Sequence, residues 1–133
     1  MKRVMFAAIG IALLAGVWVQ SARTADADET PALMKRKLQH SQKVLEGVAV
    51  QDFKMIERNA DELIQISKLA EWRAFKTPTY EVYSNDFRRI AGALAENARK
   101  KNIDAAALSY VDLTLTCVKC HKHVREIRMT SRE

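Results

Sequence analysis

Apolar residues recur every three or four positions through most of the chain after Pro31. This spacing places them on one face of an α-helix, because a helix completes a turn in 3.6 residues. Four such segments follow one another, and the links between them are short. The pattern therefore predicts an all-α fold, an antiparallel up-down-up-down four-helix bundle in which successive helices are neighbours.

The first two helices have clear predicted starts. Thr30-Pro31 places a capping residue before a proline in the first turn. Asp52 can cap the second helix, which we expect to run to about Ala70. The predicted inward face of the first helix is Met34, Leu38, Ser41, Leu45 and Val48. That of the second helix is Phe53, Ile56, Ala60, Leu63, Ile64 and Ser67.

The third helix is expected to begin near Tyr80, after a connection whose aromatic residues Trp72 and Phe75 close one end of the core. Asn102 is predicted to be a C-terminal turn residue, and Asp104 to cap a fourth helix that ends at about Arg128. The predicted inward residues of the third helix are Tyr83, Phe87, Ile90, Ala91, Leu94 and Ala98. Those of the fourth are Ala106, Tyr110, Leu113, Cys117, Cys120, His121 and Val124.

The first 27 residues differ from the rest and predict a secretory signal peptide (1–27) ahead of a bundle domain (28–133). A short basic start precedes the apolar run from Val4 to Val19, and small polar residues follow it up to Ala27. The alternative is an uncleaved membrane anchor, but the 16 apolar residues are at or below the length that spans a bilayer. We therefore expect cleavage near Ala27, export to the periplasm and no stable membrane insertion afterwards.

Composition adds little to this picture beyond excluding some functions. The chain has 133 residues, enough for one domain, and its two prolines and four glycines favour helices. Its 22 Lys and Arg against 16 Asp and Glu make it moderately basic. Because no motif interleaves aromatic and basic residues, we do not expect nucleic-acid binding.

The motif that carries chemistry is Cys117-Val118-Lys119-Cys120-His121, which contains both cysteines of the chain. Two cysteines separated by two residues, with histidine directly after the second, are the attachment signature of haem c. The thiols add to the porphyrin vinyl groups as thioethers, and His121 binds the iron as the proximal ligand. A redox Cys pair would expect a βαβ context, and half of a zinc site would expect further ligands. Neither is evident, so we predict one covalently attached haem c.

The bundle topology predicts which residues face the other side of this haem. Because the first and fourth helices are antiparallel, the start of the first lies beside the end of the fourth. Met34 and Leu38 are the large inward residues there. Met34 could bind the iron as a sixth ligand, or Met34 or Leu38 could cover a five-coordinate iron. His40 and His123 are expected on the surface, away from the iron.

From about Ala32 to Arg128 the sequence resembles the cytochrome c′ family, whose members are four-helix bundles with haem attached near the C-terminus. The strongest match is the Cys117–His121 motif followed by Arg125, because the family usually has a basic residue four positions after the histidine. The resemblance implies that Arg125 approaches the proximal side of the haem. Weaker matches are Trp72-Arg73-Ala74-Phe75, Tyr83-Ser84 and Asn102-Ile103-Asp104. The link Val50-Gln51-Asp52 is shorter than in many members.

The resemblance implies two functions that differ in the distal residue. A methionine there goes with low-spin electron carriers, and a bulky apolar residue with a five-coordinate iron that binds nitric oxide or carbon monoxide. We expect a periplasmic electron carrier, with gas binding as the alternative. Homodimers are common in the family.

Basic residues around the motif predict an acidic redox partner, although they could also be ordinary solvated charges. They are Lys119, Lys122, Arg125 and Arg128. We expect no enzymatic activity, because a peroxidase needs an acid–base group above the iron. The predicted distal face offers only Met, Leu and Ser side chains.

Overall fold

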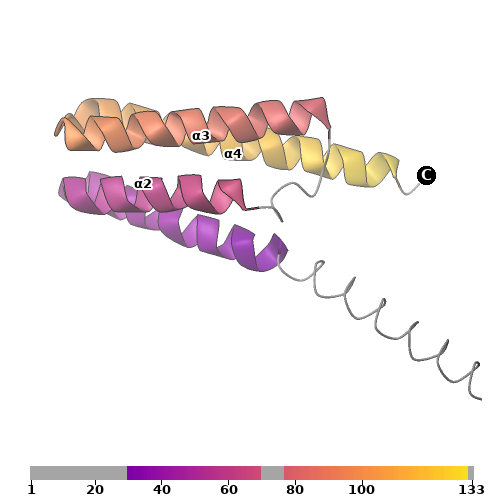
Figure 1. Cartoon of the computed structure of the whole chain (residues 1–133), viewed down its shortest axis with the longest axis horizontal. Coiled ribbons are helices and arrows are strands. Elements are labelled where there is room, and N and C mark those ends of the chain that lie inside the picture. Colours follow the sequence, from indigo (N-terminus) through magenta and orange to yellow (C-terminus); the bar gives the residue numbers. More distant parts are fainter. Residues whose placement is uncertain (1–29, 70–76, 132–133) are drawn as a thin grey trace, which may run out of the picture.

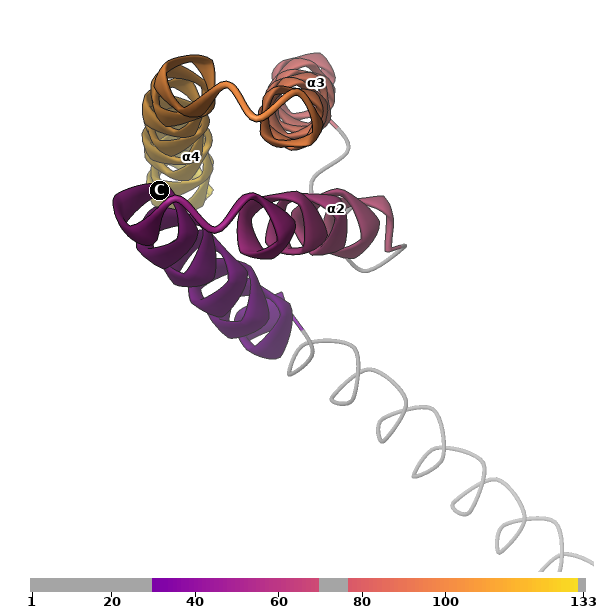
Figure 2. The same ribbon diagram turned by 90° about the vertical axis from the view of Figure 1, so that its left-hand side faces the viewer.

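The computed structural model describes residues 30–69 and 77–131, which form four helices and, within those ranges, no strand. The helices are residues 30–50, α2 (Phe53–Lys68), α3 (Pro78–Arg99) and α4 (Ile103–Thr130). Figure 1 shows that successive helices run antiparallel, and Figure 2 shows the helix of residues 30–50 beside α2 and α4. The predicted all-α four-helix bundle is confirmed. The predicted signal peptide and the aromatic pair Trp72 and Phe75 lie outside the described residues.

The start of the helix of residues 30–50 and the end of α4 lie at the same end of the bundle (Figure 1). This is the juxtaposition that the topology predicted. None of the described helices is long and apolar enough to cross a membrane.

The short links at the other end of the bundle, residues 51–52 and 100–102, share one geometry. Gln51 has φ 59° and Lys101 has φ 55°, so each lies in the left-handed region just after a helix. The amide of Asp52 donates to the carbonyl of Gly47 at 2.8 Å, and that of Asn102 donates to the carbonyl of Asn97 at 3.0 Å. This is the Schellman arrangement, which satisfies the last helical carbonyls. It explains how the link at Gln51 can be so short.

The capping predictions were partly right. Asp52 caps α2, and its Oδ1 accepts from the Met55 amide at 2.9 Å. α4 is capped by Asn102, whose Oδ1 accepts from the Ala105 amide at 3.1 Å, so the cap predicted at Asp104 is wrong. α3 begins at Pro78, earlier than predicted, because Thr77 caps it and proline suits the first turn.

The inward face predicted for the helix of residues 30–50 is wrong by a rotation of about one residue. Leu38 and Leu45 are 60% and 51% exposed, whereas Leu33, Val44 and Gly47 are buried. Gly47 accounts for the rotation, because a Cβ there would lie 2.9 Å from Ile56 Cγ1 and 3.2 Å from the Asp52 carbonyl oxygen. The helix therefore presents its glycine to α2 at close approach.

The core of the bundle is built mainly from the predicted inward positions of α2, α3 and the first half of α4. Its largest side chains with almost no exposure are Val44, Ile56, Leu63, Ile66, Leu94 and Leu113. The buried residues of α4, Ala106, Leu113 and Thr116, all lie in its first half, and no residue from 117 to 130 is fully buried. The fold therefore leaves the motif-bearing end of α4 less covered than the rest.

Candidate functional site

A groove with a cavity volume of about 640 Å³ separates the first half of the helix of residues 30–50 from the second half of α4. Leu63 of α2, Phe87 of α3 and Leu113 of α4 contribute apolar lining. The groove brings together five of the six side chains that the sequence assigned to the haem, namely Met34, Leu38, Cys117, His121 and Arg125. Leu38 reaches it from the exposed side of its helix, not from the inward face that was predicted.

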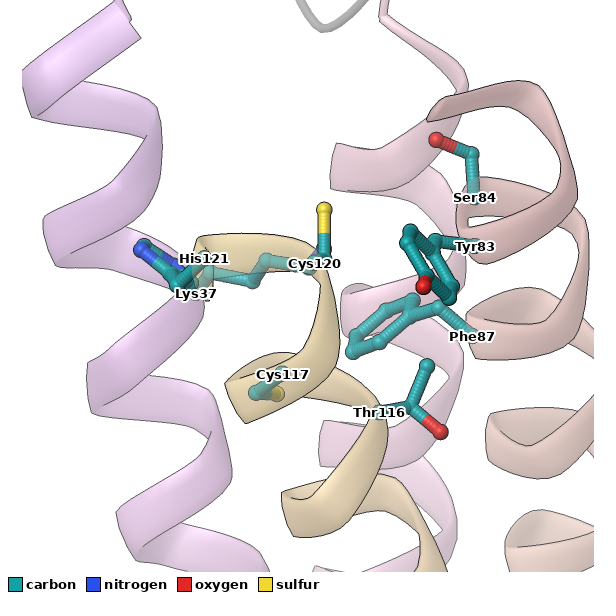
Figure 3. A pocket seen from close by; sticks show the side chains of 8 residues that line it. All are labelled: Lys37, Tyr83, Ser84, Phe87, Thr116, Cys117, Cys120 and His121. Atoms are coloured by element: carbon teal, nitrogen blue, oxygen red, sulfur yellow. The ribbon is translucent and has the colours of Figure 1, made fainter. Parts of the chain in front are cut away.

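A much smaller cavity of about 30 Å³ adjoins the motif and is lined by the sixth predicted side chain, Cys120 (Figure 3). Cys117, His121, Phe87 and Lys37 line both spaces. In Figure 3 the two cysteines come from α4, and Phe87 comes from α3 beside them. The motif thus lies at the junction of a wide groove and a narrow recess.

The two cysteines are free thiols and are partly buried. They lie three residues apart on α4, and Cys117 packs against the core. His121 follows on the same helix and is exposed, so the inward burial predicted for it is wrong, although it lines the groove. This exposure follows from the reduced cover at the end of α4.

Burial dominates the electrostatics of the motif. It raises the pKa of the Cys117 and Cys120 thiols, and the positive charge of Lys37 opposes this rise. Reactive cysteines of redox pairs have lowered pKa values, so this environment does not favour the redox alternative. Burial also lowers the pKa of His121, as do the charges of Lys37 and Arg125. The neutral imidazole that binds metals is therefore favoured.

The residue that sequence reasoning missed is Lys37. Its Nζ lies 3.4 Å from the centroid of the Phe87 ring, a cation–π contact inside the bundle. Burial lowers the pKa of Lys37 to about 7, against the opposing effect of the Cys117 and Cys120 charges. Lys37 follows the buried Leu33 by four residues and precedes the buried Val44 by seven. Correct assignment of that stripe would have revealed it.

His40 and His123 are not surface residues as predicted, because each is half-buried and joins two helices. His40 Nδ1 lies 2.9 Å from Asn59 Oδ1 of α2. His123 Nε2 lies 3.3 Å from Thr77 Oγ1, and its ring makes an edge-to-face contact with Tyr83 at 5.9 Å between centroids. Neither histidine lines the groove. His123 thereby packs against Tyr83, which lines the recess at Cys120.

The residues present fit a covalently attached haem. The donor set consists of two thiols one helical turn apart and an imidazole beside the second. The groove volume is within the usual range for cofactor pockets, and much of its lining is apolar. A structural zinc site would need four ligands. Within residues 30–69 and 77–131 no group of three or more His, Cys, Asp or Glu side chains could hold a metal ion.

The predicted basic residues around the motif are all exposed on α4: Lys119, Lys122, Arg125 and Arg128. Arg125 also lines the groove.

These features define a class: an all-α bundle whose only cysteine motif opens into a groove between its first and last helices. Two solved structures with this fold are nitric oxide complexes of single-site variants of cytochrome c prime from Alcaligenes xylosoxidans. One has a TM-score of 0.62 and 18% identity, over 73% of this chain and 90% of that one. The other has a TM-score of 0.64 and 17% identity, over 74% and 91%. The chain therefore has the cytochrome c prime fold.

No protein-family model matches the chain, and no curated protein matches it.

Proposed function

We propose that the chain is a monohaem c-type cytochrome of the cytochrome c′ kind that transfers electrons in the periplasm. The observation that carries the proposal is the single groove lined by Met34, Leu38, Cys117, His121 and Arg125, which come from opposite ends of the sequence. The sequence motif alone predicts haem c. The groove adds a space of a size suited to a cofactor, and Cys117 and His121 of the motif line it.

The chain's residues would hold the haem as follows. Cys117 and Cys120 would form the thioether links, and His121 would bind the iron from the exposed side of α4. Leu63, Phe87 and Leu113 would exclude water from the buried side, and the lower dielectric there affects redox potential. The bound haem would supply a one-electron couple.

Gas binding is the second candidate, because the similar solved structures are nitric oxide complexes of cytochrome c prime variants. It requires an open or displaceable distal position on the iron. An optical spectrum of the reduced protein separates the candidates. A low-spin spectrum that carbon monoxide does not change supports the electron carrier. A high-spin spectrum that changes on adding carbon monoxide supports gas binding.

We propose docking of an acidic redox partner through Lys119, Lys122, Arg125 and Arg128, because all four are exposed around the motif. An anionic small-molecule oxidant such as ferricyanide is a suitable probe. Its rate with the reduced protein should fall as ionic strength rises, because salt screens the attraction. Lys122→Glu should lower the rate at low salt, whereas Lys54→Glu on α2 at the other end of the bundle should not. Equal rates at all salt concentrations would contradict this docking surface.

We propose that the protein is not an enzyme, and that residues 1–27 are removed during export. Purified holoprotein should show no rapid turnover of peroxide. The mature N-terminus of the exported protein, determined by mass spectrometry, should lie near residue 28. An exported protein that retained residues 1–27 would instead indicate a membrane anchor.

A further inference from the structure

Lys37, on the helix of residues 30–50, lines the recess beside Cys117, Cys120 and His121. It lies on the same helical face as Leu33 and Val44, which are 6% and 0% exposed. A lysine on such a face would normally turn its amine to solvent. Here Nζ instead lies over the Phe87 ring, and Phe87 is itself only 4% exposed.

Lys37 lines a cavity that the predicted distal residues, Met34 and Leu38, do not line. Met34 and Leu38 line the groove but not the recess. Lys37 lines both the groove and the recess at Cys120. Among the residues that line the recess, it represents the helix of residues 30–50. Figure 3 shows it extending from that helix toward Cys120. Its amine therefore reaches past the groove wall to the edge of the motif.

The neutral amine of Lys37 would offer the iron a nitrogen ligand, whereas the side chain of Leu38, on the same helix, has no donor atom. The lone pair of the amine nitrogen can bind the metal, and a flexible four-carbon stem lets it adjust to the iron position. On binding iron, the ammonium group of Lys37 would lose one proton to water.

We propose that Lys37, not Met34, supplies the sixth ligand of the haem iron through its side-chain nitrogen. This inference rests on the proposed haem attachment. It makes the protein a low-spin cytochrome with two nitrogen ligands on the iron.

The test uses the ferric holoprotein as isolated, with electron paramagnetic resonance and near-infrared magnetic circular dichroism as readouts. The wild type should be low-spin, with a charge-transfer band typical of two nitrogen ligands. Lys37→Ala should become high-spin. Lys37→Arg should do the same, because a guanidinium keeps the charge but stays protonated and cannot bind iron. The control Lys35→Ala, also at a groove-lining position, should remain low-spin. Met34→Leu tests the other possible ligand and should also remain low-spin if Lys37 binds the iron.

Addition of a small primary amine such as methylamine to Lys37→Ala should restore the low-spin signal. If Lys37→Ala does not fold, as judged by its helical circular dichroism, Lys37→Gln keeps most of the volume and serves in its place. A high-spin wild type, or a low-spin signal that survives in these Lys37 variants, would overturn the inference.

Haem content separates this failure from failure of the proposed function. If the wild type carries covalent haem and is high-spin, only the Lys37 assignment is wrong. If the spectrum is low-spin and Met34→Leu abolishes it, Met34 is the ligand and the Lys37 assignment is again wrong. If the wild type carries no covalent haem, both the function and the inference fall.

Discussion

Gln51 and Lys101 occupy equivalent positions, each a non-glycine residue with positive φ at the end of a helix. A left-handed conformation costs a residue with a Cβ about 1–2 kcal/mol. Glycine relieves that cost but loses more backbone entropy on folding, which offsets part of the gain.

Gln51→Gly should therefore stabilise the protein by about 0.5–1 kcal/mol, the difference between these two effects. Urea unfolding followed by circular dichroism measures the change. Ala49→Gly, at an exposed helical position two residues earlier, is the matched control and should destabilise. Equal losses in both variants would contradict the left-handed geometry at Gln51.

Tyr80 is 5% exposed in the first turn of α3, and burial raises its pKa from 10.0 to about 12. The folded state thus holds the phenolic proton at pH values where the unfolded state has lost it. The contribution of this proton to stability is complete below pH 10 and is lost as pH rises from 10 to 12.

Tyr80→Phe should remove this dependence. The stability difference between wild type and Tyr80→Phe should be constant from pH 7 to pH 9.5 and should shift in favour of the variant above pH 10. Urea unfolding at a series of pH values provides the measurement. If the free energies of unfolding of the two proteins changed in parallel up to pH 12, burial would not raise the pKa of Tyr80.

At the scale of elements, the contact between the helix of residues 30–50 and α2 depends on Gly47. A Cβ there would meet the buried Ile56 and the backbone oxygen of Asp52 at 2.9 and 3.2 Å. Gly92 in α3 has no atom within 4 Å of such a Cβ. The two glycines therefore form a natural pair for comparison.

Gly47→Ala should destabilise the bundle by about 1 kcal/mol or more, because overpacking exceeds the gain in helix propensity. Gly92→Ala should stabilise it by about 0.5–1 kcal/mol, since only the propensity changes. Thermal or urea unfolding of the two variants measures both. A stabilising Gly47→Ala would show that the two helices are not in close approach there.

At the scale of the whole molecule, the four helices and their order were predictable because each has a clear apolar period. Two details were not. The rotation of the first helix depends on Gly47 against Ile56, a contact between residues of different helices that periodicity does not report. The link at Gln51-Asp52 works through backbone hydrogen bonds to Gly47 and Val48 that have no side-chain signal.

The candidate site was predictable in outline for a similar reason. The Cys117–His121 motif has a specific spacing, and antiparallel topology brought Met34 and Leu38 to it. Lys37 escaped notice because a charged residue is ordinarily read as solvent-facing, and because the buried stripe of its helix was assigned one residue too late. Its position became clear only from the packing of Leu33, Val44 and Phe87 around it.

The central claim is that Cys117 and Cys120 bind a haem covalently, and the mass of the intact mature protein tests it most directly. The claim predicts that protein exported from a host with haem-attachment machinery has the mass of the mature polypeptide plus one haem. Denaturation in acid should not remove this haem, and the double variant Cys117→Ser/Cys120→Ser should lack it. A mass equal to that of the polypeptide alone, or lower by the two hydrogens of a disulfide, would contradict the account.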